Sequence, residues 1–124
     1  MFQNIDVFRL ASQMAQHSAS RQSVIAQNIA NADTPEYQAR DIRPFHAQVT
    51  SADLSLKISQ PSHMPFVDET RYAATTRDTD YIEPNGNTVA LESEMLHASE
   101  VQRAHSRALA IYKSALNVMH RVLG

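Results

Sequence analysis

The chain of 124 residues has no cysteine, no tryptophan and only two glycines. Without cysteine, it has no disulfide framework, thiol nucleophile or cysteine-ligated zinc. Two widely separated glycines exclude the glycine-rich phosphate loops of P-loop and dinucleotide-binding proteins. The formal net charge of −2 gives no basic field for nucleic acid. The longest uninterrupted apolar run, residues 108–112, is far too short for a bilayer. We therefore expect no nucleic-acid partner and no membrane span.

Signals for secretion, metal binding and catalysis are equally scarce. Residues 1–6 lack the basic and apolar regions of a cleaved signal peptide, so we expect none. No two of the six histidines lie four residues apart, the spacing by which helical pairs bind zinc. No nucleophile elbow or spaced catalytic triad is present. We therefore expect no metal, no cofactor and no enzyme activity.

Two long helices are predicted, over residues 5 to about 32 and about 89 to 123, because apolar and small residues recur there at helical spacing. Asn87 or Thr88 is expected to cap the second helix. Its apolar residues form two adjacent heptad stripes, which are wider than one partner helix can cover. The seam positions predicted for assembly are Met95, Val101, His105, Leu109, Ile111, Tyr112, Leu116, Met119 and Leu123.

The segment between the helices differs in composition. All five prolines lie between residues 35 and 84, and only short β-capable patches occur. Residues 54–58 alternate apolar and polar side chains, which predicts one strand. We therefore predict a mainly α fold, with long N- and C-terminal helices paired as a coiled-coil hairpin and a small irregular, β-containing middle segment. The N-terminal helix is assigned to residues 1–34, the middle segment to 35–87 and the C-terminal helix to 88–124.

Charge is divided unevenly along the second half of the chain. Residues 68–100 contain eight acids and two bases, whereas residues 101–124 contain four bases and no acid. The acidic part of one subunit can therefore attract the basic part of another, although helical charges of this number are usually just solvated.

The first helix ends in an unusual stretch. Asn28 and Asn31 lie three residues apart on one face of its last turns, although asparagine is a mediocre helix former. Pro35 then stops the helix. Either these amides face water, or they form hydrogen bonds within the hairpin or between subunits, and the residue pattern alone leaves both interpretations open.

The string Asn28-Ile-Ala-Asn-Ala-Asp-Thr-Pro35, followed by Tyr37 and Ala39-Arg40-Asp41, resembles the N-terminal signature of bacterial flagellar rod and hook proteins, especially those of the proximal rod. Residues 86–95 resemble the segment that opens the C-terminal helix in the same family. The family usually has glycine where Glu36 stands. Glycine would permit a type II turn with positive φ, so Glu36 predicts a type I turn or an extended exit from the helix.

The resemblance implies a structural subunit of the flagellar basal-body rod, the drive shaft that crosses the periplasm and transmits torque. Such proteins are exported by the flagellar type III apparatus and self- and co-assemble through their terminal helices. The implied partners are other rod proteins, the export gate, the rod-to-ring adaptor protein and the membrane ring. The implied assembly residues at the helix junction are Asn28, Ile29, Asn31, Asp33, Thr34, Pro35 and Tyr37.

Two alternatives stay open. One is a soluble helical regulator or chaperone that binds a partner helix, and the other is a different rod protein. A metal-dependent helical enzyme would require ligand spacing that the chain lacks.

Overall fold

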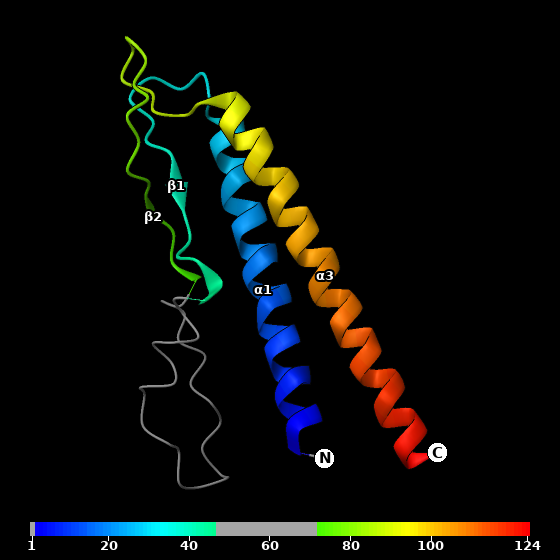
Figure 1. Cartoon of the computed structure of the whole chain (residues 1–124). Helices are drawn as coiled ribbons and strands as arrows, with labels where there is room; N and C mark the ends of the chain where they lie inside the picture. The colour runs from blue at the N-terminus through cyan, green and yellow to red at the C-terminus, as the bar shows by residue number, and fades with distance from the viewer. Residues whose placement is uncertain (1, 47–71) are drawn as a thin grey trace, which may run out of the picture.

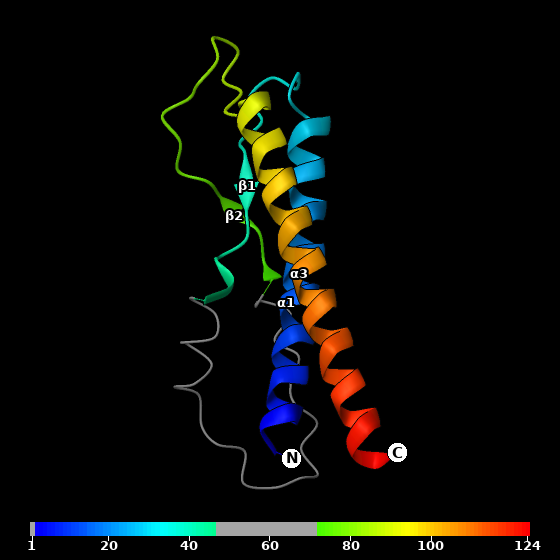
Figure 2. The ribbon, with the colours of Figure 1, turned by 45° about the vertical axis from the view of Figure 1, so that its right-hand side comes forward.

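Two long antiparallel helices dominate the computed structural model, which describes residues 2–46 and 72–124. They are α1 (Phe2–Ala30, 29 residues) and α3 (Leu91–Leu123, 33 residues). Figures 1 and 2 both place the two termini at one end of the hairpin and the turn that follows α1 at the other. The predicted helices and the mainly α fold are thus confirmed. Neither helix combines the length and apolar character needed to cross a membrane.

The contact between α1 and α3 is built largely from small and polar residues. On both helices the buried positions recur every seven residues, as expected for paired helices. Small side chains let the helix axes approach closely, but they bury little apolar area, so the core is thin. The positions with this spacing are Ala11, Ser18 and Ile25 on α1, and Glu94, Val101, Ala108 and Ala115 on α3; His17, Val24 and Asn28 of α1 are also buried.

A short antiparallel ribbon lies beside α1. Strand β1 (Arg40–Asp41) pairs with β2 (Thr75–Thr76), with Arg40 opposite Thr76. Figure 1 shows β1 running along α1, and the flanking Ala39 and Ile42 are buried. The ribbon brings charged side chains of the middle segment to the helical hairpin. The strand predicted at residues 54–58 lies outside the described residues.

The start of α3 corrects one prediction. Its N-cap is Ala90, which has extended backbone angles and makes no side-chain capping bond. The prediction that Asn87 or Thr88 caps this helix was wrong, because both side chains bind elsewhere. The Thr88 hydroxyl accepts a hydrogen bond from the Ala39 N–H at 2.8 Å, and Asn87 binds the end of α1.

Candidate functional site at the helix junction

Asn28 lies at the centre of the junction and is completely buried. Its amide nitrogen donates to the Arg40 carbonyl at 2.7 Å and to a Glu94 carboxylate oxygen at 3.1 Å. Its amide oxygen accepts from the Arg40 N–H at 3.0 Å and from the Tyr37 hydroxyl at 3.1 Å. Both donors and both acceptor sites of the amide are therefore used. One side chain thus joins α1, the chain that leaves it, and α3.

An ion-pair network continues from Asn28 across the ribbon. Glu94, also completely buried, forms an ion pair with Arg77. Arg77 also binds Asp41 at 3.1 Å, and Asp41 accepts two hydrogen bonds from Arg21, at 3.0 and 3.2 Å. Two cations and two carboxylates balance one another, which a buried charge requires. We call Arg21, Asn28, Asp41, Arg77 and Glu94 the polar junction.

The electrostatics of the polar junction are clearest at Asp41. Burial alone raises the pKa of this carboxyl group, because it disfavours the charged form. The hydrogen bonds from Arg21 and the Ile42 N–H, together with the charges of Arg21 and Arg77, outweigh that effect. The pKa of Asp41 consequently lies below its ordinary value, and the carboxylate stays ionised between the two arginines.

Asn87 closes the C-terminal end of α1 from the other half of the chain. Its amide nitrogen lies 2.9 Å from the Asn31 carbonyl oxygen and 2.8 Å from those of Ala32 and Thr34. Its amide oxygen accepts from the Val89 N–H at 2.7 Å. All three carbonyls belong to the turn that follows α1, so this buried amide supplies donors to backbone acceptors just past the helix end.

Asn31 acts locally, unlike Asn28. Its amide nitrogen donates to the Gln27 carbonyl at 2.8 Å, and its amide oxygen accepts from the Thr34 hydroxyl at 3.2 Å. It is half-buried, so the two asparagines have different roles despite their shared helix face. The remaining residues predicted at this junction for assembly, Ile29, Asp33, Thr34 and Pro35, are exposed.

The turn after Pro35 corrects a second prediction. Glu36 has φ +62°, and the Tyr37 N–H donates to the Thr34 carbonyl at 3.3 Å. This places a positive φ at the third residue of the turn, as in a type II turn, so the predicted type I or extended exit was wrong. Tertiary contacts hold the strained residue: the Glu36 N–H donates to the Asn85 carbonyl at 3.0 Å, and Gly86 packs against the Glu36 backbone.

The predicted seam positions of α3 separate into three groups. Val101 is buried, and the ring of Tyr112 lies against that of Phe8 with centroids 4.2 Å apart. The half-buried positions are His105, Tyr112, Leu116 and Met119. The exposed positions are Met95, Leu109, Ile111 and Leu123. The hairpin therefore covers only part of the predicted stripes.

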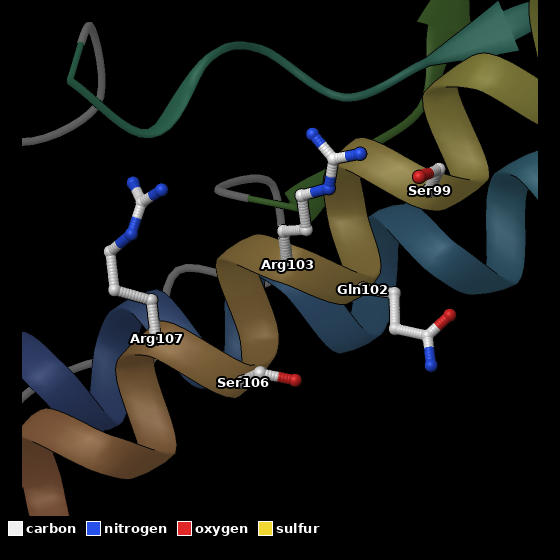
Figure 3. A pocket seen from close by; sticks show the side chains of 5 residues that line it. All are labelled: Ser99, Gln102, Arg103, Ser106 and Arg107. Atoms are coloured by element: carbon white, nitrogen blue, oxygen red, sulfur yellow. The ribbon is translucent and has the colours of Figure 1, made fainter.

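Outside the junction, α3 carries a shallow surface hollow lined by polar residues. Figure 3 shows Arg103 and Arg107 extending from neighbouring turns on one side of the helix, with Gln102 and Ser106 on another. In the described ranges, no three histidine or acidic side chains gather as a metal site would require. The fully buried polar groups are instead concentrated at the junction.

Sequence reasoning missed most of the polar junction. Glu94 precedes Val101, Ala108 and Ala115 at the same seven-residue spacing, which marks it as a seam position. Arg21 interrupts an apolar stripe of the first helix, which was a weaker signal. No local pattern marks Arg77, because its partners are distant in the sequence.

The molecule thus belongs to the class of helical-hairpin proteins with a closed polar junction and uncovered apolar helix surface. Residues 11–38, which contain the last two thirds of α1 and the turn, match the family model described as flagella basal body rod protein. The flagellar basal body rod protein FlgB of Agrobacterium fabrum is 34% identical, over 98% of this chain and 92% of that protein. The proteins of that name from Salmonella typhimurium and Escherichia coli are each 31% identical, over 85% of this chain and 83% of theirs. The chain therefore belongs to the FlgB family of flagellar basal body rod proteins.

Proposed function

We infer that this chain is a structural subunit of the proximal rod of the bacterial flagellar basal body. In this role it assembles with copies of itself and with other rod proteins through its terminal helices, and it transmits torque rather than catalysing a reaction. The names of its relatives favour this role over the soluble helical regulator or chaperone that the residues alone left open.

The uncovered apolar surface of α3 supports assembly most directly. Met95 is 63% exposed, Val122 is 68% exposed and Leu123 is 71% exposed, although all three belong to apolar stripes of this helix. Apolar side chains left exposed along a helix stripe provide a surface that a second helix can cover. A neighbouring helix would cover these side chains, while the polar junction keeps each hairpin in register.

The division of the chain follows from this role. We propose that residues 1–34 and 88–124 form the assembling hairpin and that residues 35–87 form the outer segment. The proposed partners are other rod proteins, the export gate, the rod-to-ring adaptor protein and the membrane ring. The proposed location is the periplasmic rod, which the chain reaches through the flagellar export apparatus without a cleaved signal peptide.

Replacement of Leu109 by aspartate tests the assembly role. Leu109 is 49% exposed in the hairpin, so Leu109→Asp should leave the helix content of the single chain unchanged. We expect cells with this variant to lack assembled rods and to be nonmotile, because a charge would be buried at the subunit contact. Asn117→Asp adds the same charge on the polar face of α3 and should leave swimming intact. Normal motility of the Leu109→Asp strain would contradict the assembly role of this seam.

A further inference from the structure

The outer face of α3 combines positive charge with exposed apolar side chains. Leu96, Arg103, Arg107 and Ile111 are seven, four and four residues apart, so they follow one ridge of the helix. Leu96 is 62% exposed and Ile111 is 38% exposed. Arg103 and Arg107 are exposed, extend from neighbouring turns on one side of the helix (Figure 3), and form no ion pair with any residue that the structure describes. We call these four residues the basic ridge.

A loop with the opposite character precedes α3. Residues 78–83 contain three acids, Asp78, Asp80 and Glu83, around the apolar side chains of Tyr81 and Ile82. Ile82 is 68% exposed and Tyr81 is 44% exposed, and both aspartates are exposed and form no ion pair with another residue of the described ranges. Figure 1 shows this segment in the part of the molecule farthest from the two termini. We call it the acidic loop.

We propose that the acidic loop of one copy docks on the basic ridge of a second copy. The two surfaces carry opposite charges, and each has exposed apolar side chains that the contact would bury, which gives complementarity in both respects. Within a single chain, none of the three acids pairs with either arginine. This proposal rests on the proposed assembly function and names one contact by which assembly proceeds.

The positions of the two surfaces determine the kind of array that they build. Each copy has one acidic loop and one basic ridge at different places, so the contact is heterologous and leaves a free surface of each kind. Such contacts build a closed ring or an open helical array, according to the rotation between copies, instead of a two-fold dimer. The midpoint between the two arginines lies 14 residues into α3, about 20 Å along its axis, so successive copies would be displaced along the helix direction.

The absence of cysteine makes a site-directed crosslinking test specific. One copy carries Ile82→Cys in the acidic loop, and a second carries Ser99→Cys, one turn before Arg103 on the ridge side of the hollow. The full-length proteins are mixed under mild oxidation and the 82–99 disulfide is quantified. Ser23→Cys, at an exposed position of α1, replaces Ser99→Cys as the control and should give only background crosslinking.

Charge reversal then decides whether the contact is electrostatic. With Arg103→Glu and Arg107→Glu in the second copy, we expect the crosslink yield to fall about tenfold, because two attractive contacts become repulsive. Asp78→Lys and Asp80→Lys in the first copy should restore it. Higher salt should weaken the original contact, since exposed charges are screened. Arg9→Glu with Lys113→Glu changes the net charge equally, at exposed positions outside the ridge, and should leave the yield unchanged.

The outcomes separate this proposal from the proposed rod function. Background crosslinking in the original pair, or a reversal without effect or without rescue, would overturn the docking contact. The presence of the chain in isolated basal bodies tests the rod function independently. Basal bodies that contain the chain without the 82–99 crosslink would refute the contact alone. The crosslink in purified protein, with the chain absent from basal bodies, would support the contact and refute the rod function.

Discussion

Arg77 is the residue whose removal tests the polar junction most severely. It is the cation paired with Glu94, which is completely buried on α3, and it also binds Asp41. Arg77→Met retains a long apolar side chain and removes the charge. Glu94 would then remain buried with only the Asn28 amide as a partner, and Asp41 would retain Arg21 and the Ile42 N–H.

The size of the effect follows from burial. Removing one partner of a buried ion pair typically costs about 3–5 kcal/mol, because an uncompensated charge remains. The Arg77 side chain is 18% exposed, so we expect the lower end, about 3 kcal/mol. That is a large part of the ~5–15 kcal/mol that stabilises a typical domain. Glu94→Gln should recover about 2 kcal/mol of this loss, since it removes the stranded charge and keeps its shape.

Urea unfolding followed by far-ultraviolet circular dichroism measures both variants and the double variant. The expected signature is strong non-additivity, with the double variant more stable than Arg77→Met alone. Arg9→Met, at an exposed position of α1, is the control and should change stability by less than about 0.5 kcal/mol. A loss below about 1 kcal/mol for Arg77→Met, or simple additivity with Glu94→Gln, would refute the reasoning.

Three further predictions concern the same end of the hairpin. Asn87→Asp removes the donors at the end of α1 and adds a negative charge there, so urea unfolding should show a loss of about 2 kcal/mol, whereas Asn117→Asp on exposed α3 surface should show little change. Because the pKa of Asp41 lies below its ordinary value of 3.8, the ionised carboxylate stabilises the fold at pH values above 3.8, and this contribution is lost as the pH falls through the lowered pKa. Asp41→Asn should therefore make the stability depend less on pH in that range. An unchanged acid unfolding profile would contradict the assignment. Glu36→Gly relieves the strain of the positive φ, so it should raise the free energy of unfolding by up to about 1 kcal/mol and the melting temperature with it, whereas Glu36→Ala should not. Equal effects of the two substitutions would argue against backbone strain.

The helices and their approximate limits could be predicted because they depend on short-range preferences. Periodic apolar residues without glycine or proline favour helix over residues 91–123, and the prolines confine irregular structure to the middle. The sequence pattern also predicted a surplus of apolar surface on the second helix. Which part of that surplus stays exposed was not predictable, because it depends on how α1 lies against α3.

The capping of the helices shows the limit of local reasoning most directly. Asn87 stands at a plausible position to cap α3, but its amide donates to carbonyls 53 to 56 residues away at the end of α1. Glu36 likewise adopts a positive φ that its residue type disfavours, since contacts with Asn85 and Gly86 hold the turn. In both cases tertiary contacts outweigh a local preference worth about 1 kcal/mol.

The sequence by itself determined the family, the two helices and the unusual asparagines at the end of the first, since these are properties of neighbouring residues. Only the tertiary structure decided what the asparagines do. Asn28 binds Glu94, which lies 66 residues away, and Asn31 binds its own helix turn. The physical reason is that a buried amide or charge must find a partner wherever the fold provides one. Periodicity along the chain does not encode that partner, because it arises from the packing of the ribbon and α3 around α1.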